Sequence, residues 1–229
     1  MSDSTLELAD GRALGFVDYG PPDGVPVFWC HGGPGSRMEP KMVSAAASSM
    51  GQRLIGLDRP GYGLSTPRPG RAIETCAPDL LALADHLGID RFYLVGVSTG
   101  GAYALSTAAI APERVLGVVA CCALTDMRDD TARAAMTGIS GAISDIWNSH
   151  TRDEAIAFAI EQFGSDGSKI FNQAAAGGDD ADAAVGLSDA DKAMFADPSF
   201  LANMADALQP MFAWGVEGYA DDRLADGPG

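Results

Sequence analysis

Basic residues and long apolar runs are both scarce in this sequence. Lysine and arginine number 15 against 31 aspartates and glutamates. The resulting net charge of −16 repels phosphate backbones and argues against nucleic acid as a partner. The longest apolar run, residues 115–124, is too short to cross a bilayer. Residues 1–16 contain neither a basic segment nor an apolar one, so we expect no signal peptide.

Cysteine is rare as well. None of the four cysteines forms a C-x-x-C pair: Cys30, Cys76, Cys121 and Cys122. Since metal-ligand spacings, a P-loop and a dinucleotide fingerprint are also missing, the sequence predicts no metal site and no cofactor. We interpret all four cysteines as buried thiols in a reducing compartment, which predicts a cytoplasmic location.

Short apolar runs alternate with helical patterns through the first 125 residues. Alternation around the Asp10-Gly11 turn predicts an antiparallel pair over residues 4–19. Continuous apolar runs predict four buried strands, at residues 25–30, 53–58, 92–97 and 115–124. Helical patterns separate these strands, at residues 40–50, at 78–88 and from 102 onward. The predicted fold class is α/β, a mostly parallel sheet with helices on both faces. After Leu124 only helical patterns appear, with Ser188 and Asp197 as start signals.

A serine between glycines marks the boundary of the third buried strand and the helix that follows. Gly96-Val97-Ser98-Thr99-Gly100 matches G-x-S-x-G in the strand–turn–helix context that this motif requires. A sharp, strained turn there would project the Ser98 hydroxyl from the carboxyl end of the sheet, and Gly96 and Gly100 would avoid collisions with the neighbouring backbone. Ser98 is therefore the candidate nucleophile.

Two further loops follow strand ends. His31 to Ser36, HGGPGS, is a glycine-rich turn whose backbone N–H groups would face Ser98. We expect the N–H groups of Gly33 and Thr99 to form an oxyanion hole. The segment DRPGYGLS begins at Asp58, for which we predict a structural role in fixing loop backbone.

These three motifs, in this order, resemble the α/β-hydrolase family. The resemblance implies a serine hydrolase of carboxylic esters or amides that works through an acyl-enzyme on Ser98. Family members with an aspartate at the elbow, such as epoxide hydrolases, are disfavoured by the serine, and HGGPG also occurs in proline iminopeptidase-like members. The resemblance divides the chain into a hydrolase core (1–125), a helical cap (126–215) and an acidic return segment (216–229), and it makes the chain a C-terminally shortened member whose last strands are missing.

The resemblance also implies a histidine after the nucleophile, and none is found in a suitable place. His31 belongs to the oxyanion loop, His86 lies in a helix, and His150 lies in the cap without a supporting motif. Asp126 is a weak alternative for the triad acid. We therefore expect impaired esterase activity from this chain. The alternatives are a non-enzymatic, hydrolase-like ligand-binding protein or an inactive truncated form.

The partners follow from the same features. An apolar inventory in residues 127–214 favours a small-molecule ester or amide with an apolar group. The strand at residues 115–124 would be left as an exposed sheet edge, so a second chain is a candidate to cover it.

Overall fold

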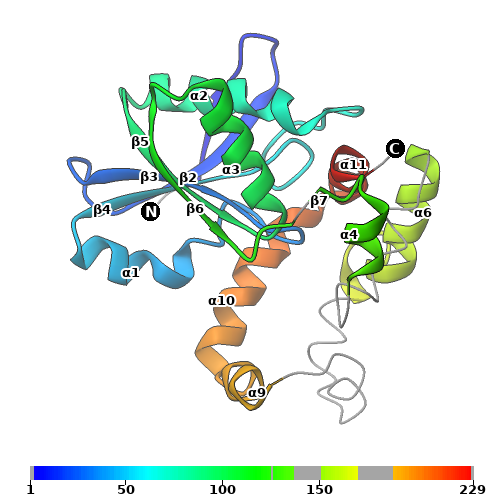
Figure 1. Cartoon of the computed structure of the whole chain (residues 1–229). Coiled ribbons are helices and arrows are strands. Elements are labelled where there is room, and N and C mark those ends of the chain that lie inside the picture. Colours follow the sequence, from blue (N-terminus) through cyan, green and yellow to red (C-terminus); the bar gives the residue numbers. More distant parts are fainter. Residues whose placement is uncertain (1–2, 125, 137–150, 170–187, 228–229) are drawn as a thin grey trace.

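The computed structural model describes residues 3–124, 126–136, 151–169 and 188–227 (Figure 1). Six strands form one sheet in the order β1-β2-β4-β3-β5-β6. Their bounds are β1 Ser4–Glu7, β2 Ala13–Tyr19, β3 Val25–Cys30, β4 Gln52–Leu57, β5 Phe92–Val97 and β6 Val115–Cys121. The strands β1/β2 and β2/β4 pair antiparallel, whereas β3/β4, β3/β5 and β5/β6 pair parallel. The predicted hairpin and the mostly parallel sheet are confirmed.

Helices lie on both faces of this sheet, as predicted. Figure 1 shows α2 (Ala77–His86) and α3 (Thr99–Ile110) on one face, with the short 3-10 turn η1 (Ile73–Cys76) leading into α2, and α1 (Lys41–Ser49) on the other. Helix α3 begins three residues earlier than the pattern indicated, because its first turn is made of Thr99 and two glycines rather than of periodic apolar residues.

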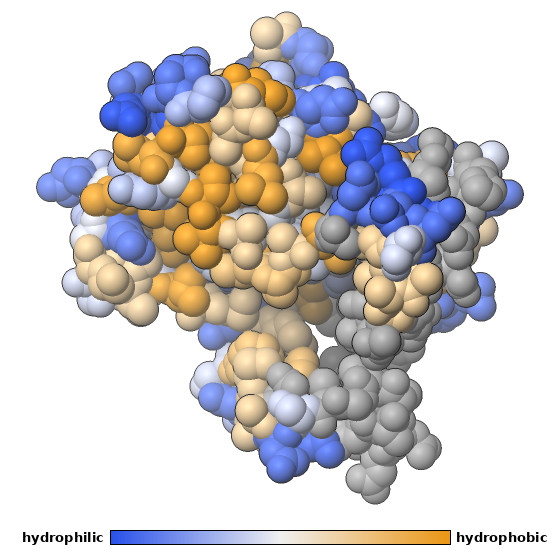
Figure 2. Space-filling view, viewed as in Figure 1, coloured by the Kyte–Doolittle hydropathy of each residue, from blue (hydrophilic) through white to orange (hydrophobic). Residues whose placement is uncertain are grey.

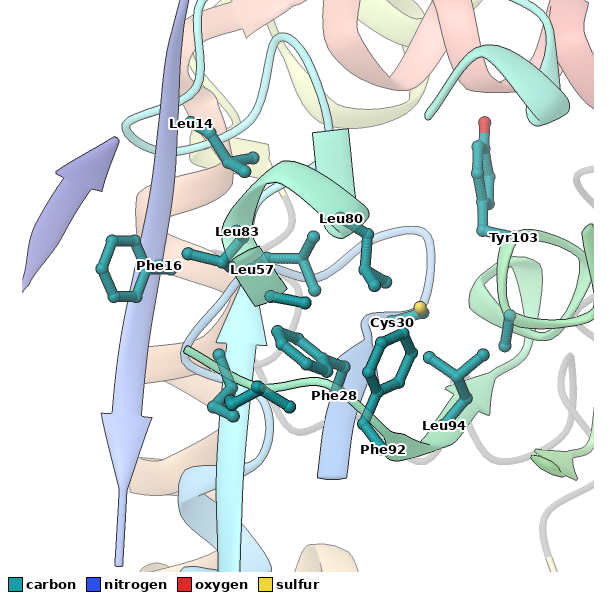
Figure 3. Packing of buried hydrophobic residues seen from close by; sticks show 14 of the residues in the cluster. Leu14, Phe16, Phe28, Cys30, Leu57, Leu80, Leu83, Phe92, Leu94 and Tyr103 are labelled. Atoms are coloured by element: carbon teal, nitrogen blue, oxygen red, sulfur yellow. The ribbon is translucent and has the colours of Figure 1, made fainter. Parts of the chain in front are cut away.

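Alternation along the strands decides which face each side chain joins. In β3, Phe28 belongs to the core beneath α2 and α3, where its ring meets Phe92 edge-on at 4.9 Å between centroids (Figure 3). The preceding residue, Val27, joins Ala47 of α1 on the opposite face. The period of two is that of a pleated strand buried on both sides.

The second face of the sheet is less well covered. A hollow of about 530 Å³ lies between α1 and the strands, lined by apolar side chains including Val43, Trp29, Tyr93 and Val119. Figure 2 shows apolar side chains gathered over β5 and β6, between α3 and α1. Tyr93 and Val119 are 42% and 57% exposed, so water reaches this apolar surface.

Beyond residue 125 the described chain is largely helical. The elements are α4 Asp130–Ala134, α6 Arg152–Phe163, α9 Asp189–Phe195, α10 Pro198–Leu208, η3 Gln209–Phe212, β7 Ala213–Val216 and α11 Glu217–Asp226. Helix α10 begins where predicted, and the Asp197 carboxylate accepts the Ser199 N–H at 2.8 Å. A second apolar cluster joins this part to the loop after β4 by packing Tyr62 and Met127 against Phe163, Phe212 and Tyr219.

Two expectations from the sequence are wrong. The four-residue strand β7 lies where only helices were predicted; four residues between a 3-10 turn and a helix are too few to show a period. Cys30 is buried, but Cys121 and Cys122 are exposed, because β6 is the last strand in the sheet order and its end lies at the surface. None of the helices in the described ranges is long and apolar enough to cross a membrane.

Candidate active site

Three loops begin at the carboxyl ends of neighbouring strands, on the same side of the sheet. In the parallel register, Cys30 of β3 lies opposite Leu57 of β4 on one side and Gly96 of β5 on the other. The loops that begin at His31, Asp58 and Ser98 therefore start side by side. From β3 the chain proceeds to β4 on one side and later to β5 on the other, and a reversal of this kind opens a crevice at the carboxyl ends of the strands.

Ser98 occupies a strained turn in this crevice. Its backbone has φ +50° and ψ −122°; Cys122 is the other non-glycine residue of the described chain with a positive φ. A Cβ atom at Gly96 would overlap the Gly100 carbonyl, and one at Gly100 would overlap the Cys30 carbonyl. The two flanking glycines are thus required by sterics, as the sequence analysis proposed.

Backbone hydrogen bonds fix the turn from both sides. The Ser98 N–H donates to the Cys121 carbonyl of β6 at 2.9 Å, and the Ser98 carbonyl accepts from Gly101 at 3.0 Å. Helix α3 begins at Thr99, so the Thr99 N–H has no acceptor within the helix and carries the positive end of the helix dipole. Ser98 itself is partly exposed.

Gly33 lies against the start of α3. A Cβ atom built on Gly33 would be 3.2 Å from the Thr99 Oγ1 atom, so the HGGPGS loop and the serine turn meet at this point. The structure therefore brings together three of the residues predicted from the sequence, Ser98, Thr99 and Gly33. An anion between the Gly33 and Thr99 N–H groups would gain from both.

Charged side chains fix the course of the HGGPGS loop. The Gly32 N–H donates to the Glu39 carboxylate at 2.7 Å. The Arg59 guanidinium donates to the His31 carbonyl and, at 2.9 Å, to the Gly32 carbonyl. Arg59 is in turn held by Asp222 of α11, with Nη2 to Oδ2 at 2.7 Å.

The histidines supply no base for Ser98 in the described structure. His31 is buried; its Nδ1 lies 2.7 Å from the Gly32 carbonyl, and its Nε2 accepts the Arg59 N–H at 3.2 Å. Burial and the nearby Arg59 guanidinium hold the pKa of His31 well below its usual range, so the ring is neutral and both nitrogens are occupied. His86 ends α2 with an exposed ring, and His150 lies outside the described residues.

The two aspartates considered in the sequence differ in environment. Asp58 is fully buried and accepts the N–H groups of Arg37 at 2.8 Å and Leu64 at 2.9 Å, which confirms its structural role. Asp126 lies on an exposed turn, where its carboxylate accepts from Arg128 at 2.8 Å. Among the described residues we see no contact that joins Asp126 to Ser98, Thr99 or Gly33.

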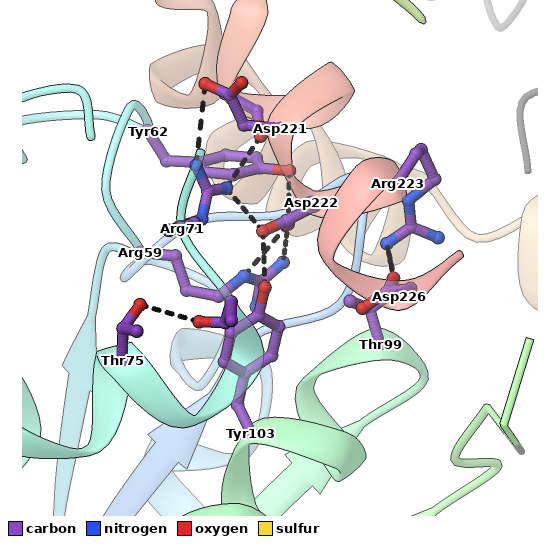
Figure 4. A network of polar contacts seen from close by, with 12 residues as sticks. Arg59, Tyr62, Arg71, Thr75, Thr99, Tyr103, Asp221, Asp222, Arg223 and Asp226 are labelled. Carbon is purple, nitrogen blue, oxygen red and sulfur yellow. Dashed lines mark hydrogen bonds and ion pairs between the residues drawn. The ribbon is translucent and has the colours of Figure 1, made fainter. Parts of the chain in front are cut away.

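A buried polar network centred on α11 was not predicted from the sequence (Figure 4). The Asp222 carboxylate accepts from Tyr62 at 2.6 Å, Tyr103 at 2.9 Å and Arg71 at 2.5 Å, in addition to Arg59. Burial alone would raise the pKa of Asp222, but Arg59 and Arg71 lower it well below the usual range. Acidic segments such as residues 216–229 are normally exposed to solvent, so their local sequence did not indicate burial. The arginines between β4 and α2 were the available sign of a buried acid that faces them.

The next residue of α11 reaches the serine turn. The Arg223 guanidinium donates to Thr99 Oγ1 at 2.6 Å and pairs with the Asp226 carboxylate at 2.6 Å. Its Nη2 atom would lie 3.2 Å from a Cβ atom built on Gly33. Burial raises the pKa of Asp226 to about 6, against the lowering effect of Arg223.

A family model and several known proteins match parts of this chain. A family model described as "alpha/beta hydrolase fold" matches residues 25–143. A proline iminopeptidase from Xanthomonas citri is 35% identical over 108 residues, which cover 46% of this chain and 34% of that protein. The dihydrolipoyllysine-residue acetyltransferase component of the acetoin cleaving system from Pseudomonas putida is 36% identical over 106 residues, covering 46% and 28%.

Structural similarity extends further along the chain. The crystal structure of the enol-lactonase from Burkholderia xenovorans LB400 superposes with a TM-score of 0.64 at 20% identity, covering 97% of this chain and 73% of that one. This likeness concerns the fold. The aligned regions span well under two thirds of the length of the two curated relatives above.

Proposed function

The chain belongs to the α/β-hydrolase fold family, and from this premise we propose that it is a serine hydrolase acting on carboxylic esters or amides. Ser98 is the nucleophile, and the N–H groups of Gly33 and Thr99 form the oxyanion hole. Residues 1–125 form the hydrolase core, residues 126–215 a helical cap, and residues 216–229 a return segment. A cytoplasmic location is part of the proposal, based on the unpaired cysteines.

One observation carries the proposal. A non-glycine residue is held at positive φ between two glycines that sterics require, and the glycine-rich loop after β3 meets the same turn. Backbone strain at a residue with a reactive side chain is typical of functional sites. Nothing in the packing of the sheet calls for such strain, because a strand can pass into a helix through an ordinary loop.

The geometry supports acyl transfer in two steps. Ser98 Oγ forms a bond to the substrate carbonyl carbon while its proton passes to a base, and the carbonyl oxygen becomes an oxyanion facing Gly33 and Thr99. The bond to the alcohol or amine then breaks, and that group leaves with a proton. Water releases the acid from the acyl-enzyme by the same route.

The general base that would deprotonate Ser98 is not identified among the described residues. Since both ring nitrogens of His31 are engaged and His86 is an exposed residue at the end of α2, we propose that the 229-residue chain turns over esters at a strongly reduced rate. Asp126 remains our candidate for the triad acid, although its carboxylate faces Arg128 in the described structure. A slow residual attack by Ser98 is expected, because the oxyanion hole still stabilises the developing charge when the base is missing.

The relatives suggest two substrate classes. Proline iminopeptidases are peptidases by name, and the enol-lactonase is named for a cyclic ester. We propose a small molecule with an apolar acyl or alcohol group, because apolar side chains such as Leu124, Met136 and Phe158 lie partly buried around the second cluster.

Turnover of p-nitrophenyl esters of increasing acyl length tests the proposal. We expect slow turnover that increases with the length of the acyl group. The Ser98→Ala variant should abolish this turnover. The matched control is Ser106→Ala, which removes a hydroxyl from α3 away from the turn. Turnover that survives Ser98→Ala would refute Ser98 as nucleophile, and fast Ser98-dependent turnover would refute the impairment.

A hydrolase-like binding protein is the second candidate, favoured by the engaged nitrogens of His31. A fluorophosphonate probe separates the two. Labelling at Ser98 indicates an activated nucleophile. A ligand-dependent rise in melting temperature without labelling favours the binding protein.

We also propose that a second chain covers the edge strand. β6 ends the sheet order. Its Leu116 is 40% exposed, and its Val119, which lines the apolar hollow, is 57% exposed. Sedimentation of wild-type protein and of Val119→Lys should show association that the substitution abolishes; a monomer at all concentrations would contradict this.

A further inference from the structure

Two consecutive residues of α11 reach both halves of the proposed oxyanion hole. Asp222 is connected to the HGGPGS loop, and Arg223 is connected to the serine turn, although α11 lies more than 100 residues further along the chain. Figure 4 shows these contacts converging from α11 onto the loops after β4 and β5.

The first connection runs through Arg59. Asp222 Oδ2 accepts from Arg59 Nε at 3.0 Å and Nη2 at 2.7 Å, which fixes the plane of the guanidinium. The same guanidinium donates to the carbonyls of His31 and Gly32, the two residues before Gly33. Because Gly32 and Gly33 share a peptide unit, a fixed Gly32 carbonyl fixes the direction of the Gly33 N–H.

The second connection is direct. Arg223 donates to Thr99 Oγ1 at 2.6 Å and is itself held by Asp226. The Thr99 side chain is fully buried, so the residue that carries the second N–H is tied to the same helix.

The surroundings make these connections rigid. Asp222 is fully buried and also accepts from Tyr62 and Tyr103, whose hydroxyl groups leave its oxygens little freedom to move. Asp221, the preceding residue, is buried too, but its partners are Arg152 of α6 at 2.7 Å and Arg71 at 3.7 Å, and neither touches the HGGPGS loop.

We propose that Asp222 and Arg223 are positioning residues that set the separation and direction of the Gly33 and Thr99 N–H groups. The inference rests on the proposed function, since it assigns these N–H groups to an oxyanion hole. An oxyanion hole works when its donors lie within hydrogen-bond reach of the developing charge, and a displacement of about 1 Å costs up to roughly 100-fold in rate.

Four variants of the full chain test the proposal. One of them, Arg223→Ala, removes the donor to Thr99 Oγ1. Asp222→Asn removes the charge that holds Arg59. Arg59→Lys keeps a positive charge beside Asp222 but loses the fork that reaches both carbonyls, and it serves if Asp222→Asn does not fold. Asp221→Asn is the matched control, one residue away on the same helix and equally buried.

The first measurement is covalent labelling of Ser98 by an alkyl fluorophosphonate at increasing concentration. We expect the maximal rate of Asp222→Asn and Arg59→Lys to fall roughly 10- to 100-fold with the half-saturating concentration unchanged, because the defect lies in stabilising charge on the phosphoryl oxygen. Asp221→Asn should stay within about threefold of wild type, since Asp221 pairs with Arg152 and Arg71 and not with Arg59, which holds the HGGPGS loop.

The second measurement is amide hydrogen exchange in residues 31–35 and 99–103. Exchange there should be faster in Asp222→Asn and Arg59→Lys and unchanged in Asp221→Asn. Equal loss of labelling and protection in Asp222→Asn and Asp221→Asn would overturn the inference, because the effect would then be general destabilisation. Faster labelling of Arg223→Ala than of wild type would also overturn it, since α11 would then obstruct the site.

The two hypotheses fail in different ways. If wild-type protein is not labelled at Ser98, the proposed function fails and hydrogen exchange alone decides the inference. Wild-type protection of residues 31–35 in Arg59→Lys would then refute it, whereas loss of that protection would support the positioning role.

Discussion

The sheet core and helix α11 are both buried, but the core buries apolar side chains whereas α11 also buries charged ones. Around Phe28 and Phe92 the core contains almost only apolar groups. Helix α11 buries the charged residues Asp221, Asp222, Arg223 and Asp226 in addition to Tyr219 and Ala220. The sheet is therefore held by packing without directional requirements, whereas the placement of α11, and with it the candidate site, depends on charge as well as on packing.

Energetics separate the two regions in the same way. Each large apolar side chain in the core contributes about 1.5–3 kcal/mol through removal from water, whatever the pH. A buried ion pair contributes little net stability compared with apolar packing, but loss of one partner leaves an uncompensated charge. The core should therefore tolerate changes of solution conditions that release α11.

The largest effect is expected in the core. Phe28→Ala should lower the free energy of unfolding by about 3–5 kcal/mol, because the side chain is fully buried and leaves a cavity beside Phe92. Chemical denaturation followed by circular dichroism measures the loss. A loss below about 1 kcal/mol would mean that this face can collapse around the cavity.

Removal of a charge beneath α11 should come next. Arg71→Met deletes the donor to Asp222 and to the Gly218 carbonyl. We expect the free energy of unfolding to fall by about 3 kcal/mol. This is at the lower end of the range for a broken buried ion pair, because Arg59 still pairs with Asp222. Amide exchange should rise in α11 before it rises in β3 and β5. Uniform exchange across both regions would contradict the contrast drawn between them.

Acidity should distinguish the regions further. The pKa of Asp226 is raised to about 6, so this group contributes stability that is present below its unfolded pKa of 3.8 and is lost as pH rises through 6. Asp226→Asn removes that contribution. Relative to wild type, the variant should therefore lose about 2 kcal/mol more on acidification from pH 6 to pH 4. Parallel pH profiles of the two proteins would place the pKa of Asp226 near its ordinary value.

The smallest effect is expected at the surface. Asp126→Asn breaks a pair with Arg128 in which both side chains are more than half exposed. Its melting temperature should equal that of wild type within error, because solvent screens the pair. The same variant tests the candidate acid: a fall in p-nitrophenyl ester turnover without a change in stability would support that role for Asp126.

Much of the first half of the molecule could be predicted from the sequence. The continuous apolar runs fixed the positions of β3, β4, β5 and β6, and G-x-S-x-G placed the strained turn at Ser98. These features are local, since strand periodicity and the steric demand of a tight turn act within a few residues. The exposure of Cys121 was not predicted, because burial at the end of β6 depends on what lies beyond the sheet edge.

The turns and the core-facing residues could be predicted because hydrophobic period and backbone sterics depend on neighbouring residues. The contact of Gly33 with Thr99 and the burial of the acidic helix after Val216 depend on the packing of distant segments. Asp222 is charged like any surface aspartate, and it is buried here because Arg59, Tyr62 and Arg71 from the segment after β4 and Tyr103 from α3 converge on it. Such convergence has no local pattern, since the partners are brought together by the folding of the sheet.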